Sequence, residues 1–271
     1  MGGRAAEHFV EAGGLRTRYL ALGDSGRPVL LLHGLHGSAD HWRWLAPRLP
    51  GFTCYAPDLK GHGRSQRPSA GYRYEDYAAH VLGLLDVLGL DAVDVIGTSM
   101  GGAVAMWMAV HFPERVGRLV LVCPAGVGKL HAPGVAQFAL GAVEILLRTR
   151  TRALADHARR TQFADPGSID PRFFAAKEAD ALRRRRDPVY RRASLAQYRA
   201  LLSPAHLDVE RIGHPTLVVW GAEDRALPWQ MAADGLARIP RARLVVLERS
   251  GHLPHVESPD RLASLVAEHL G

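Results

Sequence analysis

The stretch Val93-Asp94-Val95-Ile96-Gly97-Thr98-Ser99-Met100-Gly101-Gly102 decides the fold of this chain. It begins with an apolar run that predicts a buried strand, and the apolar residues after it, 103–109, predict a buried helix. A serine on the sharp turn between such elements has its hydroxyl pushed out of the sheet, and only glycine fits two positions away on either side, because backbone crowds there. The pattern predicts that Ser99 stands on a nucleophile elbow; the alternative is a glycine-rich turn that Ser99 only caps.

Short apolar runs alternate with helical patterns on both sides of this turn. Strands are predicted over 15–22, 28–33, 52–57, 118–123, 216–220 and 244–247, and helices over 39–49, 74–88, 100–112, 229–239 and 259–270. Ser38 is expected to cap the first of these helices and Gly89 to end the second. The alternation is typical of an α/β protein with a mostly parallel sheet and helices on both faces.

The alternation stops near residue 126 and resumes after 205. The segment 126–205 shows only helical patterns, broken by prolines, which predicts a helical cap inserted between two parts of one core, 1–125 and 206–271. This part of the chain is also basic, since residues 126–206 hold 15 Lys and Arg against 7 Asp and Glu. A solvated helix face explains the excess, and attraction of acidic substrates is the alternative.

Composition excludes several classes of protein. No apolar run approaches the roughly 18 residues that cross a membrane, and the N-terminus lacks the apolar core of a secretory signal. We therefore expect a cytoplasmic protein without stable membrane insertion. The basic segment lacks interleaved aromatic residues, which argues against nucleic acid as a partner. Without a phosphate-binding loop or dinucleotide fingerprint, no cofactor is expected, and the expected partner is a small-molecule substrate; the oligomeric state stays open.

The cysteines and the clustered histidines carry weaker signals. Cys54 and Cys123 each lie in an apolar, strand-like run, so both are expected to be buried core thiols. His33 and His36 have the spacing His-x-x-His, but no carboxylate motif joins them. We expect no metal site and no disulfide framework.

Two later loops carry the groups that a serine nucleophile needs. A serine hydroxyl is a poor nucleophile at neutral pH, so it requires a base, and the base requires a group that fixes its tautomer. Asp224 and His252 each follow a predicted strand. Because the carboxyl ends of parallel strands meet at one edge of a sheet, both are expected to lie near Ser99. The order Ser, Asp, His is that of one serine-hydrolase architecture.

Five motifs, in order and over nearly the full chain, carry a resemblance to a known family. They are His33-Gly34-Leu35-His36-Gly37-Ser38, Asp58-Leu59-Lys60-Gly61-His62-Gly63-Arg64-Ser65, the serine turn, Gly221-Ala222-Glu223-Asp224 and Gly251-His252-Leu253-Pro254. Together they resemble an α/β-hydrolase with a helical cap, of the esterase or carbon–carbon bond hydrolase kind. The resemblance implies Ser99 as nucleophile, His252 as base and Asp224 as orienting acid. Serine at the elbow argues against the epoxide-hydrolase and haloalkane-dehalogenase branches, which use aspartate there.

An oxyanion hole needs two backbone N–H groups aimed at the developing negative charge. One is expected from Met100, at the start of the helix after the nucleophile. The resemblance places the other at Leu35, with His36 as the second choice. The substrate pocket is expected to include His36, Thr98 and Phe138.

Two neighbours compete for the triad positions. Glu223 is an alternative acid beside Asp224, although the shorter aspartate and the family pattern favour the latter. His255 is an alternative base, although the glycine directly before His252 favours that residue. The stretch 58–65 is expected to form a structural turn.

The expected function is hydrolysis of a carboxylic ester, or a related acyl bond, of a small, largely apolar substrate through an acyl-enzyme. A carbon–carbon bond hydrolase of a dienone-type ring-cleavage product is the first alternative, and a lactonase the second. Relatives of the first kind share Ser99-Met100-Gly101-Gly102 but often carry Asn where this chain has Thr98. A non-catalytic ligand receptor on the same fold and a membrane-surface lipase are the remaining alternatives.

Overall fold

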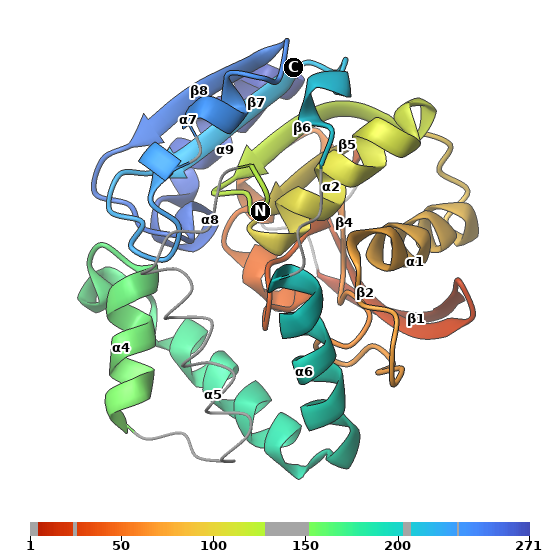
Figure 1. Cartoon of the computed structure of the whole chain (residues 1–271), viewed down its shortest axis with the longest axis vertical. Coiled ribbons are helices and arrows are strands. Elements are labelled where there is room, and N and C mark those ends of the chain that lie inside the picture. Colours follow the sequence, from red (N-terminus) through yellow and green to blue (C-terminus); the bar gives the residue numbers. More distant parts are fainter. Residues whose placement is uncertain (1–4, 24–25, 128–151, 203–206, 232) are drawn as a thin grey trace.

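The computed structural model describes residues 5–23, 26–127, 152–202, 207–231 and 233–271. Through them runs one eight-stranded sheet with the strand order β1-β2-β4-β3-β5-β6-β7-β8 (Figure 1). β1 and β2 pair antiparallel, β2 pairs antiparallel with β4, and all the remaining pairs are parallel. The carboxyl ends of β3 to β8 therefore share one edge of the sheet, which we call the carboxyl edge.

The elements have the following bounds. The strands are β1 (Ala6–Ala12), β2 (Leu15–Leu22), β3 (Arg27–Leu32), β4 (Phe52–Pro57), β5 (Val93–Thr98), β6 (Val116–Val122), β7 (Thr216–Gly221) and β8 (Ala242–Leu247). The α-helices are α1 (Tyr74–Val87), α2 (Met100–His111), α4 (Arg152–Gln162), α5 (Pro171–Arg186), α6 (Pro188–Leu202), α7 (Ala233–Leu236), α8 (Pro254–Glu257) and α9 (Pro259–Leu270). The 3₁₀ segments are η1 (Ala39–Arg43), η2 (Ala46–Arg48), η3 (Pro113–Arg115), η4 (Pro166–Ser168), η5 (Val209–Arg211) and η6 (Trp229–Met231).

Helices cover both faces of the sheet, as the alternation predicts. Figure 1 shows α1 and α2 in front of the sheet and α9 behind it. β5 is buried at every position, because it lies in the middle of the sheet with helices against it. Each predicted strand corresponds to an observed one, with ends that agree within two residues. The predicted α/β class, with a mostly parallel sheet and helices on both faces, is confirmed.

β1, which forms a hairpin with β2, was not predicted from the sequence. Its residues are mostly exposed or half-buried at the sheet edge, so they show no clear apolar alternation. The signal that marks the hairpin is the pair Gly13-Gly14, whose φ angles are 56° and 73°. Turns of this kind need glycine-like conformations between antiparallel strands.

Two predicted helices are wrong in detail. The segment 39–49 forms the short 3₁₀ helices η1 and η2, and Ser38 makes no capping hydrogen bond. The N–H of Ala39 donates instead to Asp58 Oδ1 at 2.7 Å, so a carboxylate from another loop does the capping. In the segment 229–239, the described residues form η6 and the short helix α7, which ends at Leu236.

The predicted turn over 58–65 is organised by one buried carboxylate. Asp58 is fully buried and accepts hydrogen bonds from the N–H of Ala39, the N–H of Arg64 (2.8 Å) and the guanidinium of Arg18 (3.1 Å). A Cβ at position 63 would lie 2.1 Å from an Asp58 oxygen, and φ there is 48°, so Gly63 is required. This network ties β2, η1 and the turn after β4 together at the carboxyl edge.

Replacing Asp58 by alanine is expected to lower the free energy of unfolding by about 3 kcal/mol, because the N–H groups of Ala39 and Arg64 would lose their buried acceptor and Arg18 would keep only Glu7 and Asp40 as carboxylate partners among the described residues. Urea denaturation followed by circular dichroism measures this loss. Asp260→Ala is the matched control: Asp260 forms an ion pair with Arg48 but is 80% exposed, so little change is expected there. Equal losses in the two variants would show that the buried network contributes nothing beyond a surface ion pair.

The helices α4, α5 and α6 lie together, apart from the sheet (Figure 1). α5 and α6 each begin with proline at the first helical position, where the missing N–H costs nothing. They belong to the segment predicted as a cap, whose limits of 126 and 205 stay a prediction. Phe138 and the apolar stretch 135–147 lie outside the described residues. No helix in the described part of the chain is long and apolar enough to cross a bilayer.

Candidate active site

Ser99 stands on the predicted sharp turn between β5 and α2. Its φ and ψ angles are 52° and −119°, a conformation that non-glycine residues rarely adopt. Glycine is needed at positions 97 and 101, because the neighbouring backbone leaves no room for a Cβ at either, as the motif implies. A Cβ on Gly97 would lie 2.5 Å from the Gly101 carbonyl oxygen, and one on Gly101 would lie 2.2 Å from the Leu32 carbonyl oxygen.

The strands next to β5 flank this serine. The N–H of Ser99 donates to the carbonyl of Val122, the last residue of β6, at 3.0 Å, and the carbonyl of Ser99 accepts the N–H of Ala125. On the other side, Gly34 follows β3, and a Cβ there would lie 3.0 Å from Ser99 Cβ. The serine is therefore enclosed between the ends of β3 and β6.

Asp224 and His252 meet at the same carboxyl edge. Asp224 is buried and follows β7; His252 follows β8. The His252 Nδ1–H donates to Asp224 Oδ2 at 2.7 Å. The other oxygen, Oδ1, accepts the N–H groups of Ala226 (2.9 Å) and Leu227 (2.8 Å). The carboxylate is thus fixed by three hydrogen bonds, and it holds the imidazole with Nε2 as the nitrogen left to accept a proton.

Cys123 connects the pair to the serine turn. It follows Val122, and its Sγ, a ring nitrogen of His252 and a carboxylate oxygen of Asp224 all lie within 4.8 Å of one another. Within the described residues, no hydrogen bond joins the Ser99 hydroxyl to the His252 ring. Contacts of this kind often tighten only when substrate is bound.

The predicted oxyanion donors lie at the expected ends of their elements. Met100 is the first residue of α2, where N–H groups have no intrahelical acceptor, and Leu35 lies in the loop after β3. Across the described ranges, neither backbone N–H has a hydrogen-bond acceptor.

The two rival residues have other contacts. The Glu223 carboxylate accepts the N–H groups of Arg249 (3.1 Å) and Ser250 (2.9 Å), so it holds the loop before His252. His255 is fully buried, with its ring centroid 4.7 Å from that of Trp42. Burial lowers the pKa of His255 to about 3, and the ring is therefore neutral at ordinary pH.

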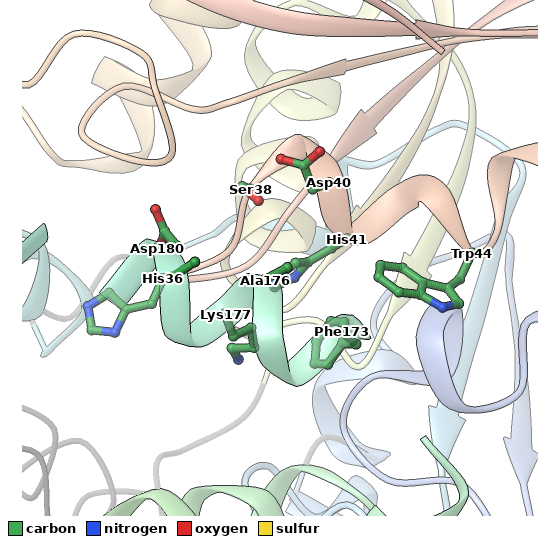
Figure 2. A pocket seen from close by; sticks show the side chains of 10 residues that line it. His36, Ser38, Asp40, His41, Trp44, Phe173, Ala176, Lys177 and Asp180 are labelled. Carbon is green, nitrogen blue, oxygen red and sulfur yellow. The ribbon is translucent and has the colours of Figure 1, made fainter. Parts of the chain in front are cut away.

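Two of the residues expected in the substrate pocket, His36 and Thr98, lie in the described part of the chain. His36, with φ of 56°, lines a cavity of about 140 Å³ between the loop after β3 and α5. Figure 2 shows this cavity, with Trp44 and His41 on the core side and Phe173 and Lys177 on α5. Thr98 does not line it; it is fully buried as the last residue of β5.

The position of Cys123 was not predicted from the sequence, which assigned it only to the core. The signal that could have found this position is that Cys123 directly follows β6. This strand lies between β5, which precedes Ser99, and β7, which precedes Asp224. Cys123, Asp224 and His252 are residue types that can bind a metal ion. The Asp224 oxygens are, however, used by the hydrogen bonds above, and burial raises the pKa of the Cys123 thiol well above its usual value, which opposes the thiolate that a metal prefers.

Four non-glycine residues of the described chain have a positive φ: His36, Ser99, Cys123 and Arg249. They follow β3, β5, β6 and β8, which all end at the carboxyl edge. Backbone strain of this kind gathers at functional sites. Here these residues lie at the same edge of the sheet as the Asp224–His252 hydrogen bond and the serine turn.

A family model described as the alpha/beta hydrolase fold matches residues 27–259. The chain is 30% identical over 274 residues to 2-hydroxy-6-oxo-2,4-heptadienoate hydrolase of Pseudomonas putida, covering 97% of this chain and 95% of that protein. The structure of a 2-hydroxy-6-oxo-6-phenylhexa-2,4-dienoate hydrolase from Rhodococcus sp. strain RHA1 is similar, with a TM-score of 0.85, 26% identity and 99% coverage of both chains. A bacterial membrane phospholipase A has the same TM-score and identity, with 98% of this chain and 86% of that chain covered.

Proposed function

Because the chain belongs to the α/β-hydrolase fold family, we propose that it is a serine hydrolase that cleaves a carboxylic ester of a small, largely apolar substrate through an acyl-enzyme. The observation that carries this proposal is the buried Asp224–His252 pair, 2.7 Å apart, at the edge of the sheet where the serine turn stands. A receptor that only bound a ligand would have no need of this pair beside a strained serine.

In the first half of the reaction, Ser99 Oγ attacks the carbonyl carbon of the substrate while His252 Nε2 removes the hydroxyl proton. Asp224 stays ionised and stabilises the imidazolium through the Nδ1–H bond. The N–H groups of Leu35 and Met100 donate to the oxyanion of the tetrahedral intermediate. The intermediate then collapses, His252 protonates the leaving alkoxide, and an acyl group remains on Ser99.

In the second half, water replaces the leaving group. His252 removes a proton from the water as it attacks the acyl carbonyl, and the same two N–H groups stabilise the second oxyanion. Collapse returns the proton to Ser99 Oγ and releases the carboxylic acid. His252, Asp224 and the two N–H groups thus have the same roles in both halves, whereas Ser99 is the nucleophile of the first half and the leaving group of the second.

Carbon–carbon bond hydrolysis of a dienone-type acid is the second candidate. Its support is the similarity, over nearly the whole of both chains, to hydrolases whose names state such substrates. Against it, Thr98 stands where the resemblance places Asn in many of these enzymes, so one amide is missing beside the nucleophile. The basic residues of the predicted cap would suit the acidic substrates of this reaction.

A substrate panel tests the choice. We expect 4-nitrophenyl esters of short and medium acyl chains to be hydrolysed with a kcat/KM at least about tenfold above that for a 2-hydroxy-6-oxo-dienoate, since one methylene or one lost polar contact is typically worth tenfold or more. Release of 4-nitrophenolate and loss of the dienoate absorbance measure the two reactions. A preference for the dienoate would replace the ester proposal by the second candidate, and a lactone in the same panel covers the lactonase alternative.

A further inference from the structure

The loop that carries His252 lies directly on residues 160–165, the end of α4 and the turn after it, which we call the cap edge. The N–H of His252 donates to the carbonyl of Gln162 at 2.7 Å. A Cβ on Gly251 would lie 2.5 Å from that oxygen and 2.8 Å from Phe163 Cα. Glycine at position 251 is therefore required by the closeness of the cap edge.

Glu257, the last residue of α8, joins the same two segments through its carboxylate. Oε2 accepts the N–H of Gly251 at 2.5 Å, and Oε1 accepts the N–H of Asp165 at 3.0 Å. Burial raises the pKa of Glu257, although these backbone N–H groups oppose the shift. One partly desolvated carboxylate thus binds one donor from the His252 loop and one from the cap edge.

The loop that carries the acid contacts the cap edge as well. Arg225 follows Asp224, and its Nη1 donates to the carbonyls of Arg160 (2.8 Å) and Phe163 (3.4 Å). Carbonyls at the C-terminal end of a helix lack intrahelical donors and attract cations. Both loops of the acid–base pair therefore bind the same end of α4.

An apolar contact completes this junction. The Phe163 side chain is fully buried in a cluster with Leu253 and Val256, which lie on either side of the start of α8. Figure 1 shows the end of α4 facing α8. The junction thus combines a buried apolar contact with specific hydrogen bonds. Together they define one arrangement of the cap edge against the His252 loop.

We propose that Glu257 is a positioning residue that couples the seating of the cap edge to the placement of the His252 imidazole. This rests on the proposed role of His252 as the base. When the cap edge moves away from the core, the His252 N–H loses its acceptor and Glu257 loses the N–H of Asp165. The peptide that orients the imidazole is then free to turn, and Nδ1 moves away from Asp224. The cap therefore contributes to the turnover number and not only to substrate binding.

The test replaces Glu257 by glutamine. A glutamine amide offers one oxygen and one NH₂ group, so it cannot accept both N–H groups. We expect kcat for an activated ester to fall about tenfold or more, because small misplacements of a reacting group are costly, while KM changes less than about threefold. Hydrogen–deuterium exchange should rise together in peptides covering 160–166 and 249–256, which contain the amides of these bonds.

Glu223→Gln is the matched comparison, because Glu223 holds the same loop through contacts with Arg249 and Ser250 that stay within the core. It should raise exchange in 249–256 alone. Glu268→Gln, which alters a surface ion pair with Arg243, should leave kcat and exchange unchanged. Arg225→Gln is the second probe if Glu257→Gln does not fold, and it should raise exchange in 160–166 and lower kcat.

The proposal is overturned if exchange in Glu257→Gln rises in only one of the two segments, or if its kcat equals that of Glu268→Gln. Failure of the proposed function has a different signature: Ser99→Ala would keep its activity. Coupled exchange is read without turnover, so the two failures are distinguishable.

Discussion

Replacement of Ser99 by alanine is expected to lower kcat for an activated ester by about 10³-fold or more, because no other group forms the acyl-enzyme. The residual rate reflects the oxyanion donors and substrate binding alone. Steady-state release of 4-nitrophenolate measures the loss, and a fluorophosphonate probe should label the wild-type protein and not the variant.

Ser264→Ala is the matched control, because Ser264 is an exposed serine of α9 whose hydroxyl donates only to its own helix. It should keep the full rate. Retention of more than about a tenth of the rate by Ser99→Ala would contradict the proposed mechanism, since triad residues act as a unit.

Replacement of Asp224 by asparagine is expected to lower kcat by about 10⁴-fold at neutral pH. The change is nearly isosteric, but an amide nitrogen facing Nδ1 turns that nitrogen into the acceptor. Nε2 would then carry the proton and could not accept one from Ser99. A pH–rate profile of kcat, recorded with the same ester, measures the loss.

Glu223→Gln separates the two acids. Its carboxylate accepts backbone N–H groups of the loop before His252, so only a moderate loss from loop loosening is expected, far below that of Asp224→Asn. A larger loss in Glu223→Gln than in Asp224→Asn would make Glu223 the acid and overturn the assignment.

Strands and long helices follow from local pattern, which is why β3 and α1 agree with their predictions. Buried parallel strands are continuous apolar runs, and α1 ends where glycine at position 89 adopts a φ of 66°. A continuous helix over 39–49 does not form, because Pro47 has no N–H to donate within it. The acceptor for the first N–H of the segment is Asp58, which is 19 residues away in sequence. No local pattern contains that contact.

The residues of the site also fall into two groups: those that a local motif indicates and those that only long-range contacts reveal. Motifs name Ser99, Asp224 and His252, and the order of parallel strands explains why Asp224 and His252 lie at one edge. The roles of Cys123 and Glu257 depend on contacts between segments far apart in the chain. Glu257 in particular follows a histidine motif, but its second partner, the N–H of Asp165, belongs to another part of the chain.

The four positive φ angles have a consequence for engineering. Each of His36, Ser99, Cys123 and Arg249 holds a backbone conformation that costs about 1–3 kcal/mol outside glycine. A laboratory selection for heat resistance alone would favour glycine at these positions, and at position 99 that change removes the proposed nucleophile. Thermal stability and the proposed catalytic activity therefore favour different residues at position 99, because both depend on the same backbone torsion angles.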